Sequence, residues 1–333
     1  METSLFDYYL PESAIAQTPV TPRDSSRMLI DGEPLQHKFV RDLPSLVKPG
    51  DILVLNNTRV MRARLNLFKE TGGSVEVLVL NEIAGGLWEA LIRPSRKVPP
   101  GTVLYDSSQH PVIKVKGVGE SRTRVVAPMS SSMAEIMKNC GDIPLPPYIA
   151  NELEDSERYQ TIFAEQETSV AAPTAGLHLT RSVLDGINQA GANIGFVELS
   201  VGLGTFRPID TNDVTEHEMH EEYYRIDSEV WKACGEANRV IAIGTTVVRA
   251  LESAAVTGNL VGKTNLFITP GFEFSLVQGL LTNFHLPRSS LLVMIEAFVG
   301  TRWRELYQVA LDDGYRFLSF GDAMFLQRKP LDT

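Results

Sequence analysis

Cysteine is scarce in this sequence, and long hydrophobic runs are absent. The 333 residues include only Cys140 and Cys234, which lie far apart and form no Cys-x-x-Cys pair. We therefore expect neither a disulfide framework nor a cysteine-based zinc site, and we interpret both residues as buried thiols. No segment reaches the roughly 18 uninterrupted apolar residues that a membrane span requires, and the N-terminus shows no basic leader with an apolar stretch. A cytoplasmic location is therefore expected.

Common nucleotide-binding and hydrolase motifs are also missing. The sequence contains no phosphate-binding loop, complete Gly-x-Gly-x-x-Gly, His-Glu-x-x-His or Gly-x-Ser-x-Gly pattern, which argues against kinases, nicotinamide-dependent dehydrogenases, zinc proteases and α/β-hydrolases. The nearest approach is Gly202-Leu203-Gly204-Thr205, directly after a predicted strand. Glycines there would let backbone N–H groups approach a ligand closely, although a tight turn without a ligand remains the alternative.

Positive charge is under-represented in the chain as a whole, but it is concentrated in one segment. The net charge is -10, which argues against nonspecific coating of nucleic acid, because such binding requires many neutralised phosphates. Between Arg59 and Arg124 there are eleven Lys and Arg residues against six Asp and Glu residues, so this segment is +5 and the remainder is -15. Either a solvated basic face or an RNA contact would explain this separation.

Residues 51–127 are predicted to form short strands. Segments rich in Val, Ile and Leu alternate polar and apolar residues with period two, at 51–55, 74–80, 87–92, 112–116 and 122–126. Glycine and proline turns such as Gly72-Gly73 and Gly85-Gly86 separate them, and no helix-length pattern intervenes. Closely spaced short strands of this kind indicate a small β-barrel or sandwich.

After residue 130 helices and strands alternate. Helices are predicted at 131–140, 180–190, 228–239, 245–255 and 289–299, and strands at 193–201, 240–244, 265–269 and 281–286. The predicted fold is therefore α/β, with a large α/β domain that contains a mostly parallel sheet. We expect this domain to comprise residues 1–58 and 130–333, with residues 59–129 inserted as a small β-barrel domain.

Four of the six histidines stand in unusual surroundings and are candidates for proton transfer, because histidine titrates near neutral pH. His178 and His285 each lie in a segment rich in proline, glycine and small polar residues. His217 and His220, three residues apart, could share one helical face and bind a metal, but no third ligand is identifiable and no metal is expected. Structural hydrogen bonding remains the alternative for each histidine.

Further polar, glycine and proline clusters fall where predicted strands end. Examples are Asn56-Asn57-Thr58-Arg59, Gly244-Thr245-Thr246 and Phe320-Gly-Asp322-Ala-Met324. In open α/β sheets ligands bind outside the carboxyl ends of the strands, so these clusters are predicted to form one pocket.

The same segments, in this order, closely resemble the S-adenosylmethionine:tRNA ribosyltransferase-isomerase family of queuosine biosynthesis. The resemblance extends nearly from end to end and includes Arg23-Asp-Ser-Ser-Arg27, Pro144-Leu-Pro-Pro-Tyr148, Ala171-Ala-Pro-Thr-Ala-Gly-Leu-His178, Val201-Gly-Leu-Gly-Thr-Phe-Arg-Pro208, Thr282-Asn-Phe-His-Leu-Pro287 and Ser319-Phe-Gly-Asp-Ala-Met324. Departures are small, such as Leu179 where the family more often has Phe. None removes a histidine or glycine of these motifs.

This resemblance implies a reaction and its substrates, and the residue patterns described above supply candidate site residues for it. S-adenosylmethionine would donate its ribosyl unit to 7-aminomethyl-7-deazaguanine at the wobble position of tRNAs with GUN anticodons, giving epoxyqueuosine and releasing adenine and methionine. The candidates for the proton transfers are His178, His285, His217 and His220, with His178 and His285 ranked first, and we expect at least one of the four to be required. The predicted residues of the S-adenosylmethionine pocket are Gly202, Gly204, Thr205, Thr174, Gly176, Thr245, Thr246, Asn283 and Asp322. The predicted RNA-binding residues are Arg59, Arg62, Arg64, Arg93, Arg96 and Lys97.

Two other classes of protein remain as alternatives. An S-adenosylmethionine-dependent RNA methyltransferase could use the Gly202 loop, and it would release S-adenosylhomocysteine without free adenine. A noncatalytic tRNA-binding module could use the basic segment and would need none of the histidines. Product analysis with labelled S-adenosylmethionine and substrate tRNA separates all three.

Overall fold

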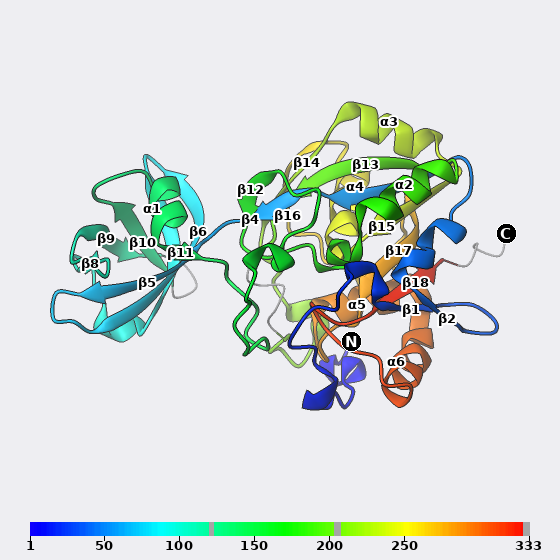
Figure 1. The fold of residues 1–333 in the computed structure, drawn as a ribbon, viewed down its shortest axis with the longest axis horizontal. Coiled ribbons are helices and arrows are strands. Elements are labelled where there is room, and N and C mark those ends of the chain that lie inside the picture. The colour runs from blue at the N-terminus through cyan, green and yellow to red at the C-terminus, as the bar shows by residue number, and fades with distance from the viewer. Residues whose placement is uncertain (120–122, 203–207, 329–333) are drawn as a thin grey trace. The chain divides into compact units, whose positions relative to one another are not determined.

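A computed structural model describes residues 1–119, 123–202 and 208–328 of the chain (Figure 1). Contacts divide it into two compact units, Met1–Arg59 with Pro146–Thr333 and Val60–Leu145. The second unit ends later than the expected boundary at 129, because helix α1 (Met133–Cys140) packs on strands β5 (Arg64–Lys69) and β10 (Arg124–Pro128). Helix α1 begins with a side-chain cap, since the Ser132 side chain accepts a hydrogen bond from the Glu135 N–H.

The larger unit is built on a nine-stranded sheet. Its order is β16 (Val261–Thr264), β14 (Glu222–Ile226), β13 (Asn193–Leu199), β3 (Asp51–Asn56), β15 (Arg239–Ile243), β17 (Val277–Asn283), β18 (Ala323–Gln327), β1 (Arg27–Ile30) and β2 (Gln36–Phe39). The four central strands β13, β3, β15 and β17 pair in parallel, and β18 pairs in parallel with β1. Every other pairing is antiparallel, so the α/β fold is confirmed but the sheet is mixed, not mostly parallel.

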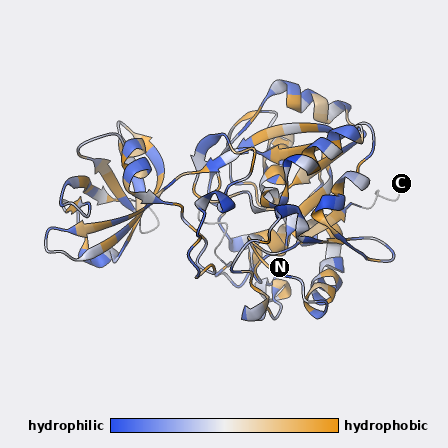
Figure 2. Cartoon of the chain, in the orientation of Figure 1, coloured by the Kyte–Doolittle hydropathy of each residue, from blue (hydrophilic) through white to orange (hydrophobic). Residues whose placement is uncertain are grey.

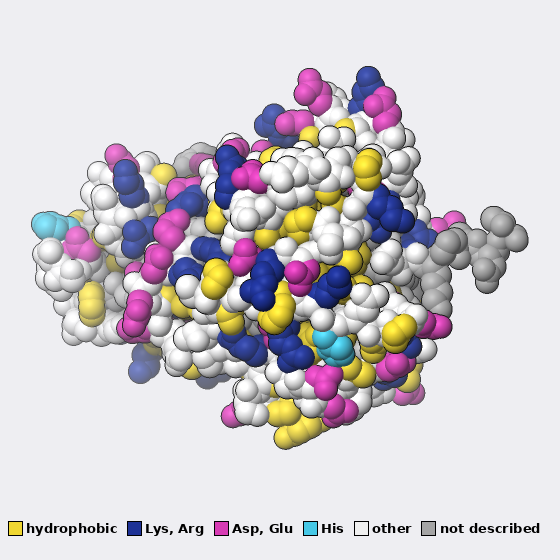
Figure 3. Space-filling view, turned by 45° about the vertical axis from the view of Figure 1, so that its right-hand side comes forward, with side chains coloured by type: hydrophobic (Ala, Val, Ile, Leu, Met, Phe, Trp, Pro, Cys, Tyr) yellow, Lys and Arg dark blue, Asp and Glu magenta, His cyan; other side chains and the backbone are white. Residues whose placement is uncertain are grey.

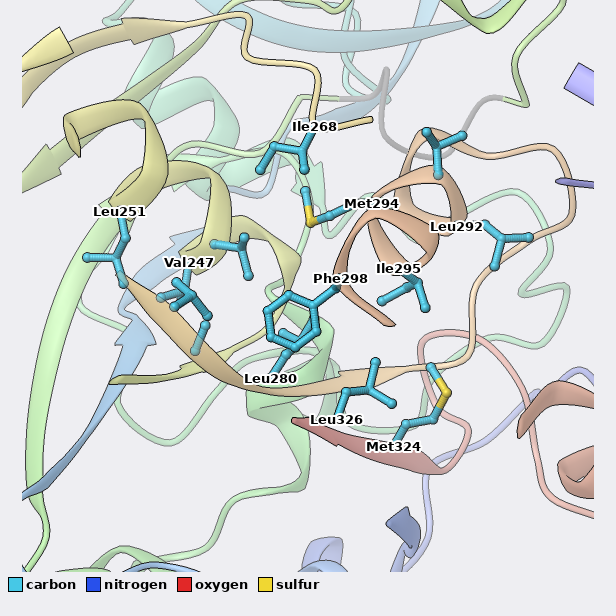
Figure 4. Close-up of a cluster of buried hydrophobic side chains, with 14 of the residues drawn as sticks. Val247, Leu251, Ile268, Leu280, Leu292, Met294, Ile295, Phe298, Met324 and Leu326 are labelled. Carbon is cyan, nitrogen blue, oxygen red and sulfur yellow. The ribbon is translucent and has the colours of Figure 1, made fainter. Parts of the chain in front are cut away.

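Both faces of this sheet are covered by packed hydrophobic side chains. On one face α4 (Thr245–Thr257), α5 (Ser290–Val299) and α6 (Trp303–Asp312) bury residues against the strands, and Figure 4 shows Leu251, Phe298 and Leu280 within this cluster. On the other face α2 (Arg181–Gln189) contributes a buried stripe. Helix α3 (Ser228–Glu236) packs beside β13. Hydrophobic residues follow the strands of both units (Figure 2).

The smaller unit contains a closed antiparallel barrel, as predicted. Around it run β5, β6 (Ser74–Ala84), β7 (Leu87–Arg93), β10, β9 (Pro111–Val118) and β8 (Val103–Tyr105), and β8 pairs again with β5. Leu65 and Leu67 on β5 alternate with less buried neighbours, which is the period-two pattern of a strand with one face in the core. Strand β11 (Gly141–Asp142) extends the sheet at β5. Outside both sheets, β4 (Thr58–Val60) pairs with β12 (Gln166–Ser169).

Several local predictions were wrong or incomplete. Residues 265–269 form no strand, and the nearby strand is β16, which precedes them. Residues 217–221 form no helix, so His217 and His220 do not share a helical face. Strands β1, β2, β14 and β18 and helix α6 were not predicted. Strands β1 and β18 pair with each other although they are distant in the sequence.

No helix among the described residues is long and apolar enough to cross a membrane. The helix predicted at 289–299 is α5, whose residues Leu292, Val293 and Ile295 are buried in the core of the larger unit. On the face shown in Figure 3, acidic and basic side chains are interspersed among uncharged ones.

Candidate functional site

Several of the predicted site segments lie at one edge of the nine-stranded sheet. Because β13, β3, β15 and β17 are parallel, their carboxyl ends lie at the same edge, which is where open α/β sheets bind ligands. Strand β18 runs antiparallel to β17 and starts there, since Asn283 is paired with Ala323. Strand β1 also starts there, with Met28 beside Ala323. Ser26 and Asp322, each just before one of these strands, are therefore brought to this edge.

At this edge His178 is held by hydrogen bonds on both sides of its ring. It ends the short 3-10 helix Thr174–His178, which packs against β17. Its Nδ1 lies 3.0 Å from the Ser26 hydroxyl, and its Nε2 lies 3.1 Å from Asn283 Nδ2. Thr174 donates a 2.9 Å hydrogen bond to the Asn283 side-chain oxygen. Three predicted site residues, Thr174, His178 and Asn283, thus form one network with Ser26, which sequence reasoning did not single out.

A narrow pocket borders this network. His178, Ser26, Ser319 and Phe320 contribute to its wall together with Arg23 and Arg158. Arg23 donates to the carbonyl oxygens of Gln160 at 2.9 Å and Leu177 at 3.2 Å, which ties the N-terminal segment to the histidine-bearing turn. Burial, together with the positive charges of Arg316 and Arg23, lowers the pKa of His178 to about 4.

His285 lies two residues after the end of β17, and its backbone is clamped from both sides. Tyr8 donates a hydrogen bond to the His285 carbonyl oxygen, and the His285 N–H donates to the Tyr307 hydroxyl at 2.9 Å. The ring Nε2 lies 3.0 Å from the Thr282 hydroxyl, whereas Nδ1 has no hydrogen bond among the described residues. Burial lowers the pKa of His285 to about 3.

These two buried histidines should make stability fall in acid. In the unfolded chain both rings take up protons below about pH 6.5. In the folded protein the rings stay neutral to lower pH, because the pKa is about 4 for His178 and about 3 for His285. Unfolding therefore binds protons in this range, and the free energy of unfolding decreases as the pH falls from about 6.5. Denaturant titrations between about pH 7 and 5 should show this decrease, and it should be smaller in His178→Gln.

His217 and His220 lie outside the network of His178. His217 is partly buried against the ring of Phe267, with ring centroids 5.5 Å apart, and His220 is exposed. Burial lowers the pKa of His217, against the opposing effect of Asp210. Within the described residues no group of three or more His, Cys, Asp or Glu side chains could hold a metal ion.

The loop at Gly202 is anchored by a buried ion pair. The Gly202 N–H donates a 2.9 Å hydrogen bond to Glu222 Oε1, and the other carboxylate oxygen accepts from Arg249 on α4. Burial raises the pKa of Glu222, and the charge of Arg249 opposes this rise. Gly204 and Thr205, predicted for the same pocket, lie outside the described residues.

Glu222, which holds the Gly202 backbone, was not singled out by sequence reasoning. The run from Glu216 to Glu222 resembles a solvated acidic surface, and only the last of these residues is buried deeply. A signal was present, because Glu222, Tyr224 and Ile226 alternate with exposed residues along β14. In that pattern Glu222 occupies an inward position.

The start of α4 forms another part of the edge. Gly244 precedes the helix with a φ of 97°, which a residue with a side chain rarely adopts. Thr245 is buried, and the buried Thr246 hydroxyl has no hydrogen-bond partner in the part of the chain that the structure describes. The first N–H groups of a helix are donors without intrahelical partners, so this point can accept a polar ligand.

Gly176 and Asp322, both predicted for the donor pocket, have evident structural contacts. A Cβ at Gly176 would lie 2.9 Å from Thr161 Cγ2 and 3.0 Å from the Phe163 ring, so close packing explains this glycine. Asp322 accepts hydrogen bonds from the backbone N–H groups of Arg27 at 2.8 Å and Arg316 at 2.9 Å.

The six predicted RNA-binding cations fall into three groups. Arg59 belongs to the larger unit, where it forms ion pairs with Glu157 and Glu167. In the smaller unit Arg62 and Arg64 donate to backbone carbonyl oxygens of the same unit. The remaining three of the six cations, Arg93, Arg96 and Lys97, are exposed and have no ion pair or side-chain hydrogen bond among the described residues.

Fold and site together define a two-unit α/β protein with a closed barrel and a polar site at the carboxyl edge of its parallel strands. A family model described as queuosine biosynthesis protein matches residues 3–326. The chain belongs to this family.

Proteins named S-adenosylmethionine:tRNA ribosyltransferase-isomerase are similar to the chain over nearly its whole length. The one from Rubrobacter xylanophilus is 47% identical over 330 residues, covering 98% of each chain. The one from Thermotoga maritima is 44% identical and covers 98% of this chain and 100% of that protein. A crystal structure of the S-adenosylmethionine tRNA ribosyltransferase from Thermotoga maritima aligns with a TM-score of 0.56 at 35% identity, covering 97% of this chain and 99% of that one.

Proposed function

We propose that the protein transfers and isomerises the ribosyl unit of S-adenosylmethionine onto 7-aminomethyl-7-deazaguanine at the wobble position of tRNA. The observation that carries this proposal is the full-length similarity to proteins named for that activity. The products are epoxyqueuosine-containing tRNA, adenine and methionine. The names of these relatives give no support to the methyltransferase alternative.

The chemistry that this reaction requires suits the carboxyl edge of the sheet. The sulfonium acidifies the ribose 5′ carbon, a base takes that proton, adenine leaves with help at a ring nitrogen, and the attacking amine must be neutral. We assign the donor pocket to the edge that carries Thr174, Gly202, Thr245 and Thr246. We assign a proton transfer to His285, because its ring Nδ1 has no hydrogen bond among the described residues.

The products of the reaction test this proposal directly. The purified chain would be incubated with S-adenosylmethionine labelled separately in adenine, ribose and methionine, together with tRNA that carries 7-aminomethyl-7-deazaguanine. We expect free adenine and methionine in equal amounts and ribose label in the tRNA. S-adenosylhomocysteine without adenine would instead identify a methyltransferase, and tRNA binding without any product would identify a binding module.

We propose that the barrel unit contacts the tRNA. The recognised tRNAs are those with GUN anticodons, and the protein acts in the cytoplasm. Reversing charge at Arg93, Arg96 and Lys97 should weaken tRNA binding, because these exposed cations are available to phosphates. The slope of log affinity against log salt should decrease by about 0.7–0.9 for each lost phosphate contact. Binding isotherms at several salt concentrations measure both quantities.

A control with the same change in net charge separates this contact from a general electrostatic effect. Lys48, Lys232 and Lys263 are exposed cations of the larger unit, and their reversal to Glu should alter affinity much less. Equal losses in the two triple variants would contradict the placement of tRNA on the barrel.

Gly202→Ala should weaken binding of S-adenosylmethionine without unfolding the protein. A Cβ at Gly202 would meet only Glu222 Oε1, at 3.9 Å, among the described residues, so stability should change by less than about 1 kcal/mol. A ligand that approaches this backbone would lose about tenfold or more in affinity, which is about 1.4 kcal/mol. Calorimetric titration with S-adenosylmethionine checks this expectation.

Gly176→Ala is the matched comparison, because its Cβ would clash with Thr161 and Phe163. We expect this variant to lose about 1–3 kcal/mol of stability through overpacking. Normal S-adenosylmethionine affinity in folded Gly202→Ala would remove the Gly202 backbone from the donor pocket.

A further inference from the structure

The backbone carbonyl of Leu318 determines how the Asn283 side chain is oriented. Asn283 Nδ2 donates to the Leu318 carbonyl oxygen at 3.1 Å, and Asn283 Oδ1 accepts from the Thr174 hydroxyl at 2.9 Å. The reverse orientation would place the amide oxygen against the carbonyl oxygen, two acceptors without a proton between them. The NH2 group must therefore face Leu318.

The same NH2 group also faces His178, and this determines where the imidazole carries its proton. Asn283 Nδ2 lies 3.1 Å from His178 Nε2, so Nε2 must accept a hydrogen bond and cannot carry a hydrogen. The proton of the neutral ring therefore resides on Nδ1, which donates to the Ser26 hydroxyl at 3.0 Å. Both Ser26 and Asn283 are buried, so water does not compete easily for either position.

Protonation of His178 would break this arrangement. A hydrogen on Nε2 would point at the NH2 hydrogens of Asn283, and rotating the amide to relieve this would set its oxygen against Leu318. The charged side chains on the elements packed around the turn are Arg23 and Asp24 before β1 and Glu157 and Arg158 in the 3-10 helix Ser156–Tyr159, together with Arg316. Asp24 accepts from Thr180 at 2.8 Å, and Glu157 is paired with Arg59. The two acidic groups are thus already engaged.

We propose that Asn283 is a positioning residue that holds His178 as a neutral imidazole with its proton on Nδ1. His178 then forms a fixed, uncharged part of the pocket wall and does not exchange protons with the substrate. This inference rests on the proposed function for the identity of the substrate, and it changes the predicted roles of both residues. The Asn283 side chain forms hydrogen bonds with three protein partners, so it positions His178 and does not bind the ribosyl donor.

Nitrogen-15 NMR of the full chain with labelled histidine tests the proposal independently of activity. Pyridine-type and pyrrole-type ring nitrogens have distinct shifts, and His178→Gln identifies the resonances of His178 by their loss. We expect an unprotonated Nε2 and a protonated Nδ1 from about pH 5.5 to about 8.5, a range in which an ordinary histidine titrates. A proton on Nε2 at neutral pH, or titration within this range, would overturn the proposal without any variant of Asn283.

Two variants that each remove one partner of the same ring identify which residue is responsible. Asn283→Ala frees Nε2, so His178 should populate the tautomer with a proton on Nε2 and should take up its second proton at a higher pH than in the parent protein. Ser26→Ala removes the opposite partner, and Nε2 should remain unprotonated because Asn283 still donates to it. If the ring in Asn283→Ala behaves as in the parent protein, Asn283 does not have this role.

Adenine release provides the functional readout. In Asn283→Ala a hydrogen on Nε2 no longer meets the amide NH2 group, so the acidic limb of the adenine-release rate should lie at higher pH than in the parent protein. Failure of the proposed function and failure of the role assigned to Asn283 can be distinguished. A parent protein that releases no adenine, yet shows the expected tautomer, contradicts the proposed function and leaves the role of Asn283 standing.

Discussion

Glu222→Ala should lower the free energy of unfolding by about 3–5 kcal/mol, because it leaves the Arg249 guanidinium buried without its partner. Glu222 is 4% exposed and Arg249 is 2% exposed, so water cannot replace the lost carboxylate. Two carbonyl oxygens, of Leu266 and Thr264, would remain as acceptors for Arg249, but neither carries the compensating charge. Urea denaturation monitored by circular dichroism measures the difference.

The adjacent residue provides the control. Glu221 pairs with Lys263 at 3.3 Å, but both side chains are more than half exposed, so Glu221→Ala should cost less than about 1 kcal/mol. Replacing the buried pair together, as Glu222→Leu with Arg249→Met, should recover most of the loss, because no unpaired charge remains. Similar losses in Glu221→Ala and Glu222→Ala would contradict the assignment of Glu222 to a buried anchor.

His285→Ala should reduce the rate of adenine release by at least about 10²-fold, the minimum expected when an acid or base is lost. The variant should still fold, since Tyr8 and Tyr307 bind the backbone of residue 285 and not its ring. The pKa of about 3 keeps the ring neutral, so His285 should add no limb to the pH–rate profile between about pH 5 and 8. Single-turnover measurement isolates the chemical step from product release.

His217 and His220 serve as matched controls for this prediction. Both lie outside the edge network, and alanine at either position should leave adenine release within about threefold of the parent, far from the 10²-fold expected for a lost acid or base. A rate within about threefold of the parent in folded His285→Ala would exclude His285 from proton transfer.

Elements with strong local signals were predictable from the sequence, whereas those fixed by distant partners were not. Thr180 caps α2, and Ser289 caps α5, as the residue types at these positions indicate. The alternation within residues 74–126 correctly indicated a barrel, whereas the strand predicted at 51–55 is β3, which is fully buried in the sheet of the larger unit. Strand β1 was missed because its register depends on β18, which is almost three hundred residues away. No local pattern carries that information.

The same distinction holds for the candidate site. Sequence motifs selected Thr174, His178 and Asn283 as candidates, and the structure places these three residues in one hydrogen-bond network. Composition could not show that the Asn283 side chain is hydrogen-bonded to the protein. One of its partners is the backbone carbonyl of Leu318, and the residue type at a position does not indicate what its backbone carbonyl binds. The buried state of Glu222 also depends on Arg249, which lies on a different element.

The placement of the N-terminal strands has a consequence for synthesis of the chain on the ribosome. Residues of β1 and β3 emerge first, but β3 lies between β13 and β15, and β1 needs β18 as a neighbour. The barrel, whose strands all lie between residues 64 and 142, can close much earlier. At about 5–20 residues per second, roughly ten to forty seconds separate its completion from the appearance of β18. During that interval the hydrophobic strands of the larger unit are without partners, so chaperone binding should concentrate on them and not on the barrel.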